Sequence, residues 1–263
     1  MSDLPATDLH VTHLGDHGSR VLFFHGLFGQ GRNWTQIAKE VAADHRVTLV
    51  DLPNHGRSAW TEQMDYLDVA DRLAALIDAD DPAVVVGHSM GGKAAMALAL
   101  RHPTLVERLA VVDVSPVSYA HGSEFVGFVE AMRAIDLTTL ESRADADARL
   151  APAVENSTVR GFLLQNLRRD GDGWRWQVNL EGIRDGLTQV GGWPAADLAD
   201  VAPYDGPVLW VAGERSDYVA DDYSEAMERW FPRARRVTVK GAGHWVHSEQ
   251  PDVFVAILHR FLA

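Results

Sequence analysis

The sequence predicts an α/β protein with a mostly parallel central sheet and helices on both of its faces. Short valine-rich runs alternate with longer segments rich in alanine and leucine, which is the pattern of repeated strand–helix units. This alternation stops between residues 116 and 203, where the chain becomes more polar and helical. The length of 263 residues fits one large α/β domain that carries an insertion.

Each predicted strand is a short apolar run in which β-branched residues are frequent. Thr7–Leu14 is expected to add an antiparallel strand at one edge of the sheet. The other predicted strands are Val21–His25, Val47–Asp51, Val84–Gly87, Leu109–Val114, Val208–Ala212 and Val237–Lys240.

The predicted helices lie between these strands and are rich in good helix formers. The last one has Ser248 as its expected N-cap and Pro251 in its first turn, since serine satisfies a terminal amide and proline needs no partner there. The predicted helices are Trp34–Ala43, Leu67–Ile77, Met90–Arg101, Tyr223–Trp230 and Pro251–Leu262.

The irregular stretch at residues 116–203 is expected to form a cap subdomain, inserted into a core of residues 1–115 and 204–263. Its predicted helices are Phe125–Ile135, Ala144–Leu150 and Val159–Arg168, and the glycine–aspartate turn at residues 171–173 predicts a short hairpin. A (β/α)8 barrel is the competing architecture, but it requires regular strand–helix units that this stretch does not provide. A stabilising excursion with no role in binding is the alternative interpretation of the insertion.

The composition argues against several classes of function. The net charge of −13 argues against binding to nucleic acids or anionic membranes. The absence of cysteine excludes disulfides, thiolate catalysis and cysteine-ligated zinc. No cluster has metal-ligand spacing and no phosphate loop is present, so we expect no metal and no cofactor.

The first residues are acidic and lack the apolar core of a secretory signal. No run approaches the ~18–20 apolar residues that span a bilayer. We therefore expect a cytoplasmic protein without a membrane span, present as a monomer or a small homo-oligomer.

Residues Gly87–Gly91 read Gly-His-Ser-Met-Gly and lie between a predicted strand and a predicted helix. A Gly-x-Ser-x-Gly motif in this position is typical of a nucleophile elbow, a sharp turn that exposes the serine hydroxyl at the edge of the sheet. We expect a positive φ at Ser89, and glycine at the flanking positions because a Cβ atom there would clash with the neighbouring strand and helix. Ser89 is therefore the candidate nucleophile.

A serine hydroxyl is a weak nucleophile until a base takes its proton. His244 is the best candidate for that base, because it lies in a glycine-rich loop after the predicted strand Val237–Lys240. An acid must hold the other ring nitrogen, and two aspartates qualify. Asp113 ends a buried apolar strand, whereas Asp217 lies in the loop after Val208–Ala212.

Together these motifs resemble the α/β-hydrolase fold, the superfamily of serine esterases, lipases and thioesterases. Phe23–Gly29 resembles its oxyanion loop, Asp51–Ser58 resembles the loop after its fourth strand, and Gly241–Trp245 resembles the loop that carries its histidine. The run Gly87–Lys93, followed by Val112–Pro116, resembles a narrower group of bacterial short-chain esterases and related mitochondrial α/β-hydrolase domain-containing proteins. The resemblance extends over most of the chain.

The resemblance implies an α/β-hydrolase fold with a helical cap inserted after strand 6 of that fold. It implies that Asp113 completes the triad with Ser89 and His244, because the narrower group carries its acid at this position; Asp217 is the alternative. The backbone amides of Leu27 and Met90 are expected to form the oxyanion hole.

The implied activity is the hydrolysis of small-molecule carboxylic esters with short to medium acyl chains, with thioesters as a further class. C–C bond hydrolases, lyases and perhydrolases use the same triad on this fold and are the alternative. A non-enzymatic binding protein is a further alternative, but such a protein would be expected to lack a member of the triad.

Several other side chains are candidates for the surroundings of the site. Phe28 is a second candidate for the oxyanion donor, and His55 for the pocket wall. Lys93, one turn into the helix after the elbow, is expected to contact the cap or Asp113, or to be solvated. The aromatic candidates for the walls of an acyl pocket are Phe28, Trp34, Trp174, Trp176 and Trp245.

Overall fold

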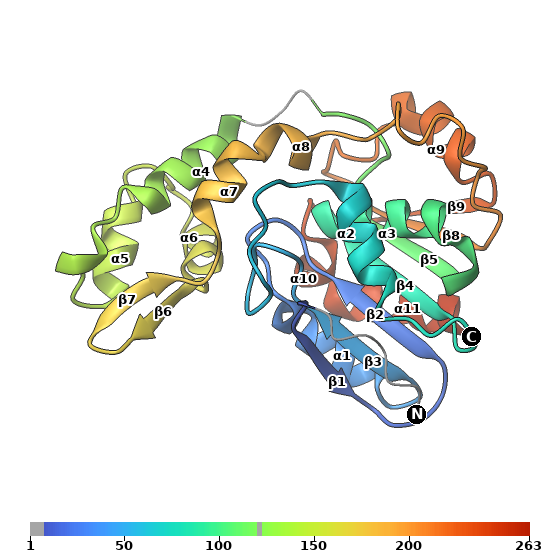
Figure 1. Cartoon of the computed structure of the whole chain (residues 1–263), viewed down its shortest axis with the longest axis horizontal. Helices are drawn as coiled ribbons and strands as arrows, with labels where there is room; N and C mark the ends of the chain where they lie inside the picture. The colour runs from blue at the N-terminus through green and yellow to red at the C-terminus, as the bar shows by residue number, and fades with distance from the viewer. Residues whose placement is uncertain (1–7, 120–122) are drawn as a thin grey trace.

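The central sheet has the strand order β1-β3-β2-β4-β5-β8-β9 in the computed structural model, which describes residues 8–119 and 123–263 (Figure 1). β1 runs antiparallel to β3, and every other neighbouring pair is parallel, as predicted. The strands of this sheet are β1 Val11–Leu14, β2 Arg20–Phe24, β3 Arg46–Val50, β4 Ala83–His88, β5 Val106–Val112, β8 Val208–Gly213 and β9 Ala234–Val239.

The predicted strands are confirmed, with ends that differ by a few residues. β5 and β9 begin earlier than predicted, at Val106 and Ala234, because each pairs with a neighbour before its valine-rich part starts. The edge strand begins only at Val11, and residue 7 of its predicted range lies outside the described residues. The strand that the α/β-hydrolase fold counts as its sixth is β5 in the order of this chain.

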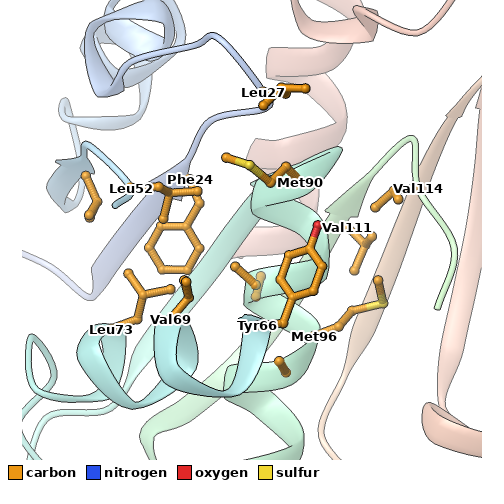
Figure 2. Close-up of a cluster of buried hydrophobic side chains, with 14 of the residues drawn as sticks. Phe24, Leu27, Leu52, Tyr66, Val69, Leu73, Met90, Met96, Val111 and Val114 are labelled. Atoms are coloured by element: carbon orange, nitrogen blue, oxygen red, sulfur yellow. The ribbon is translucent and has the colours of Figure 1, made fainter. Parts of the chain in front are cut away.

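Helices cover both faces of the sheet, as strands that are apolar on both sides require. Alternate residues of a strand point to opposite faces. In β2 this places Phe24 in the cluster beneath α2 and α3, and Phe23 in the cluster beneath α1 and α11. Figure 2 shows the first cluster, in which Val69 and Leu73 of α2 lie against Phe24. These helices are α1 Thr35–Val41, α2 Tyr66–Ala74, α3 Met90–Arg101 and α11 Pro251–Leu262.

α11 has its predicted bounds, but its N-cap is Gln250 and not Ser248. Ser248 lies inside a short helix, α10 Val246–Glu249, where its amide donates to the carbonyl of Trp245 at 2.9 Å. The prediction for Ser248 was wrong because an additional helical turn precedes Pro251. The residue before a proline is forced out of the helical region, so the break between α10 and α11 falls at Gln250.

The segment between β5 and β8, here called the inserted segment, forms a lobe beside the sheet (Figure 1). The predicted hairpin is confirmed, since β6 and β7 pair in the antiparallel direction. The predicted helix Val159–Arg168 ends at Leu164, because the chain enters β6 at Leu167. The elements of the segment are α4 Ser123–Arg133, α5 Arg143–Leu150, α6 Ser157–Leu164, β6 Leu167–Asp170, β7 Gly173–Trp176, α7 Leu180–Asp185 and α8 Leu187–Gly191.

Polar side chains join the inserted segment to the loops of the core. Nε2 of Gln30 donates to Oδ1 of Asn166 at 2.8 Å, and Nδ2 of Asn179 donates to Oδ1 of Asn54 at 2.8 Å. All four side chains are buried, so each hydrogen bond satisfies groups that would otherwise be costly to bury.

The remaining helices are short or lie at the rim of the core. Within residues 8–119 and 123–263, no helix is long and apolar enough to cross a membrane. These helices are α9 Ser224–Trp230 and the 3-10 turns η1 Gly31–Trp34, η2 Pro103–Leu105, η3 Leu137–Thr139 and η4 Asp221–Tyr223.

Candidate active site

Ser89 lies in the turn between β4 and α3 and has the positive φ that the elbow motif predicts, 52°. A Cβ atom at Gly91 would lie 2.5 Å from the carbonyl oxygen of His25, and one at Gly87 would lie 2.2 Å from the carbonyl oxygen of Gly91. Both positions therefore require glycine, as predicted. The turn holds the serine in a strained backbone conformation at the carboxyl edge of the sheet.

The structure brings Ser89, His244 and Asp113 together from three distant parts of the chain. Nε2 of His244 lies 3.0 Å from Oγ of Ser89, and Nδ1 lies 2.8 Å from Oδ2 of Asp113. A carboxylate can only accept, so the ring proton lies on Nδ1 and Nε2 accepts from the serine hydroxyl. This is the arrangement in which an imidazole can take the proton of a serine that attacks a carbonyl carbon.

Asp113 directly follows β5, is completely buried, and has a φ of 52°. Its carboxylate accepts from the amide of Gly213 at 2.8 Å and from the hydroxyl of Ser216, in addition to His244. A buried carboxylate is costly unless it is hydrogen-bonded. These three donors therefore satisfy the buried carboxylate of Asp113 beneath the histidine ring.

Asp217, the alternative acid, is exposed and forms no hydrogen bond or ion pair with any described residue. Its two neighbours take part in the site instead. The hydroxyl of Ser216 donates to Asp113, and the ring of Tyr218 stacks on that of His244 with centroids 4.2 Å apart. Neither Ser216 nor Tyr218 is predicted from the sequence as part of the site. The signal that could have found them is their position in the loop after β8, where this fold commonly carries its acid.

The loop after β2 places the amide of Leu27 near the start of α3. Figure 2 shows Leu27 on this loop beside Met90. The amides of Leu27 and Met90 have no hydrogen-bond partner among the described residues, whereas that of Phe28 donates to Nε2 of His55 at 3.2 Å. The two predicted oxyanion donors are therefore available to a ligand, whereas the amide of Phe28, the second candidate, already donates to His55.

Buried histidines support this loop as neutral rings. Nε2 of His25 accepts the amide hydrogen of Leu52 at 2.9 Å, which only an unprotonated nitrogen can do. Burial lowers the pKa of His25 to about 4 and, together with the nearby His25, lowers that of His55 to about 3. Nε2 of His88 donates to the carbonyl of His244 at 2.9 Å, and burial holds the pKa of His88 well below its usual value. These neutral rings fix the loops on both sides of Ser89.

Ser89 lines two mainly apolar cavities, and Leu27 and Phe125 line both. The first cavity lies on the side of His244, and the second lies on the side of Met90. The other apolar walls of the first are Phe28, Trp34, Phe128, Val159, Phe162, Leu163 and Trp245. The other apolar walls of the second are Val114, Tyr119, Leu187, Val190 and Tyr218.

The expectation that Trp174 and Trp176 wall this pocket was wrong. Both lie on β7, and neither borders a cavity that Ser89 lines. Trp174 instead packs against Arg169, whose guanidinium carbon lies 4.0 Å from the centroid of the tryptophan ring. His247 does border the first cavity, and its Nδ1 atom is buried without a hydrogen-bond partner.

Lys93 is buried rather than solvated, and its ammonium group joins the two connections of the inserted segment. Nζ donates to the carbonyl of Val117, after β5, at 2.9 Å. It also donates to the carbonyls of Gly191 and Gly192, at the end of α8, at 2.7 and 2.6 Å. Burial lowers the pKa of Lys93 to about 7, but three carbonyl acceptors match the three donors of the charged form. The expected contact of Lys93 with the insertion is therefore confirmed.

Among the described residues, no group of three or more histidine, cysteine, aspartate or glutamate side chains is placed to hold a metal ion. The groups gathered at Ser89 are a hydroxyl, an imidazole, a carboxylate and two unpaired amides. This set can transfer an acyl group through a covalent serine intermediate, because it supplies a nucleophile, a base and a site for developing negative charge.

Comparisons with known proteins show which proteins this chain is similar to. The profile of a family described as alpha/beta hydrolase fold matches residues 19–251. The chain is 38% identical over 251 residues to the sn-1-specific diacylglycerol lipase ABHD11 of Mus musculus, a match that covers 92% of this chain and 80% of that protein. It is 33% identical over 248 residues to esterase YbfF of Escherichia coli (strain K12), and this match covers 94% of both chains.

A solved structure described as a marine microorganism esterase has the same fold, with a TM-score of 0.92. It is 32% identical in sequence, and the match covers 97% of this chain and 100% of that one. The similarity therefore includes the inserted segment as well as the sheet.

Proposed function

Since the chain is a carboxylesterase-like hydrolase that belongs to the α/β-hydrolase fold family, we propose that it cleaves small carboxylic esters with Ser89, His244 and Asp113 as its catalytic triad. The observation that carries this proposal is the hydrogen-bonded chain from Ser89 Oγ through His244 to Asp113, with distances of 3.0 and 2.8 Å. The unpaired amides of Leu27 and Met90 support it, because they can stabilise an oxyanion beside the serine.

In the first half of the reaction, Oγ of Ser89 attacks the ester carbonyl while Nε2 of His244 takes its proton. The negative charge moves to the carbonyl oxygen, which the amides of Leu27 and Met90 hold. Asp113 stabilises the positive imidazolium without taking its proton. Collapse of the tetrahedral intermediate breaks the bond to the alcohol, which leaves with the proton from His244.

In the second half, water attacks the acyl group on Ser89, and His244 takes a proton from the water. The same two amides hold the second oxyanion. Collapse releases the carboxylic acid and returns the proton to Oγ. Thioesters can follow the same steps with a thiol in place of the alcohol, so they are the second proposed substrate class.

The two cavities suggest how the substrate lies. The leaving oxygen must reach Nε2 of His244, and that ring borders only the first of the two cavities. We therefore assign the leaving group to the first cavity and the acyl chain to the second. Val114, Leu187 and Val190 wall the second cavity, which supports a preference for short to medium acyl chains.

The inserted segment is proposed to act as a cap. In this division, residues 116–203 form the cap subdomain and residues 1–115 and 204–263 form the hydrolase core. The segment supplies Phe125 to both cavities, Phe162 to the first and Leu187 to the second. A cytoplasmic location and a monomeric or small homo-oligomeric state remain predictions.

The test is a series of p-nitrophenyl esters from acetate to palmitate, with a fluorophosphonate probe as an independent label of the nucleophile. We expect turnover to be fastest for the short and medium chains and the label to attach to Ser89. Ser89→Ala should abolish labelling and reduce kcat by about 10⁴–10⁶-fold, because the triad acts as a unit. Activity of this variant within tenfold of the wild type would rule out the serine mechanism.

The ester series also tests the alternative reactions of this fold. Absence of turnover with every ester, together with labelling of Ser89, would favour a C–C bond hydrolase, a lyase or a perhydrolase. Absence of both turnover and labelling would favour a binding protein. A rate that rises steadily up to palmitate would contradict the assignment of the acyl chain to the second cavity.

A further inference from the structure

A polar cleft lined by arginines lies between the core and the β6–β7 hairpin, apart from the cavities of the proposed active site. Arg32 and Arg57 reach it from core loops, and Arg168, Arg169 and Arg175 reach it from the hairpin. None of these side chains borders either apolar cavity. Five arginines therefore line one cleft in a chain whose net charge is −13.

Among the described residues, carboxylates offset only a small part of this charge. Other arginines form ion pairs, such as Arg46 with Asp81 at 3.0 Å, whereas no described carboxylate lies within 4.0 Å of a guanidinium nitrogen of the cleft arginines. The acidic side chain on the cleft wall, Asp51, accepts the backbone amide hydrogens of Gly31 at 2.7 Å and Arg57 at 2.9 Å. Asp51 is the single carboxylate among the residues that line the cleft, against five arginines, so the cleft retains an excess of positive charge.

Two of these arginines face each other across the hairpin. Arg168 of β6 and Arg175 of β7 are direct partners in the antiparallel register, and like charges in such a pair destabilise a sheet. Burial lowers the pKa of Arg168, and the positive charges of neighbouring arginines lower it further. An anion bound between the two guanidinium groups would remove this repulsion, so the pair is suited to a negatively charged ligand.

An aromatic surface lies at the rim of the same cleft. Trp60 is 58% exposed, the largest exposed fraction among the large hydrophobic side chains of the described residues. Exposed tryptophan rings are the surfaces on which nucleic-acid bases stack. The combination of Trp60 with the guanidinium groups therefore matches a ligand that has both an aromatic ring and phosphate groups.

We propose that this cleft binds a nucleotide that carries two or more phosphate groups, with the phosphates between Arg57, Arg168 and Arg175 and the base on Trp60. Arginine suits this task because its planar donors match phosphate oxygens in pairs. A long nucleic acid is disfavoured, because the acidic surface of the rest of the chain repels a polyanion that extends beyond the cleft.

The nucleotide has two possible sources with the same chemistry. One is a free nucleotide that binds beside the active site. The other is the nucleotide part of a coenzyme A thioester, whose acyl group reaches Ser89; this source rests on the proposed function. In both cases the ligand bridges the core and the inserted segment, because Arg57 belongs to one and Arg175 to the other.

The first experiment measures the binding of ADP to the whole protein by titration calorimetry at low salt. We expect saturable binding that weakens at least tenfold in the double variant Arg57→Gln/Arg175→Gln, and weakens further as salt is added. Neither side chain forms a hydrogen bond with a described residue, so the double variant should fold. Trp60→Ala is a second variant and should also weaken binding.

The matched control is Arg235→Gln, an exposed arginine on β9 at the opposite edge of the sheet. It makes the same change of charge outside the cleft, and ADP should bind to it as to the wild type. No binding of ADP to the wild type at millimolar concentration would overturn the proposal. Equal affinities of wild type, double variant and Trp60→Ala would also overturn it.

A second experiment separates the two sources. Acetyl-coenzyme A is compared with acetyl-pantetheine, which has the same thioester but no phosphate or base. A KM that rises at least tenfold in the double variant for the first substrate alone identifies the coenzyme A source. An unchanged KM, with ADP binding still lost, identifies a free nucleotide. Hydrolysis of p-nitrophenyl acetate by the wild type tests the proposed function separately.

Discussion

The elbow region and the inserted segment are held in place by different forces. At the carboxyl end of β4, segments of backbone lie so close together that Gly87 and Gly91 cannot carry a side chain. Ser89 and Asp113, which follow β4 and β5, both adopt strained backbone conformations with φ of 52°. The inserted segment is joined to the core by buried polar ties, chiefly those of Lys93, Asn166 and Asn179. The proposed reacting groups are therefore held by close contacts of the backbone, while the walls of the cavities depend on a few hydrogen bonds.

This difference has a consequence for mutations. Changes in the elbow region should affect the chemical step strongly, because they alter groups placed to within a hydrogen-bond length. Changes in the ties of the inserted segment should affect substrate binding and stability more than chemistry.

After Ser89→Ala, the largest effect is expected when the acid beneath His244 is changed. Asp113→Asn should lower kcat by up to about 10⁴-fold, because an amide presents the wrong hydrogen-bond partner to the imidazole. Asp217→Asn is the matched control and should cost less than tenfold, since its carboxylate is exposed. Steady-state kinetics with a short ester measures both variants. A larger loss in Asp217→Asn would show that the assignment of the acid is reversed.

A smaller effect is expected at the tie between the two connections of the inserted segment. Lys93→Met removes three donors and leaves the carbonyls of Val117, Gly191 and Gly192 without their partner. We expect kcat/KM to fall about tenfold, mainly through KM, since buried unpaired carbonyls favour rearrangement of the segment. Lys240→Met, at an exposed lysine, is the control. A fall in kcat alone would assign Lys93 to the chemical step instead.

The buried histidines predict how stability depends on pH. The pKa values of His25 and His55 in the folded state, about 4 and about 3, lie below their ordinary value. The unfolded chain therefore binds more protons on acidification, and stability falls as the pH drops below about 6.5. Each histidine should contribute a loss of about 1 kcal/mol between pH 7.5 and pH 5.5.

Urea unfolding at both pH values measures this loss. His55→Gln should reduce the difference between the two pH values, because glutamine does not titrate. His17→Gln is the control, since His17 is exposed on the surface. If His55→Gln keeps the full pH dependence of the wild type, the neutral ring of His55 is not its source.

The smallest effect is expected at a single peripheral tie. Asn179→Ala removes the hydrogen bond to Asn54 and the cap of α7, where Asn179 accepts from Gly182 at 3.0 Å. The free energy of unfolding should fall by about 1 kcal/mol, with kcat nearly unchanged. Thermal unfolding compared with the exposed control Gln189→Ala tests this. A large loss of kcat would contradict the contrast between the two regions.

Much of the core could be predicted because its signals are local. The alternation of apolar runs and helical segments predicted the mostly parallel sheet. The motif at Gly87–Gly91 predicted the positive φ of Ser89. The ends of β5 and β9 and the N-cap of α11 were less predictable. They depend on neighbouring strands and on an extra turn before Pro251, which a pattern within one segment does not contain.

The sequence by itself determined the elbow and its candidate serine, because the glycine spacing constrains a single turn of the backbone. It also indicated the candidate histidine, because His244 lies in a glycine-rich loop directly after a predicted strand. Only the tertiary structure decided the surroundings. In the folded chain Asp113 is buried beneath His244 and accepts from Ser216, whereas Asp217 is exposed. Lys93 donates to carbonyls of the inserted segment. Arginines from core loops and from a distant hairpin line one cleft. These contacts join residues far apart in the chain, so they depend on strand register and on how the inserted segment packs against the core.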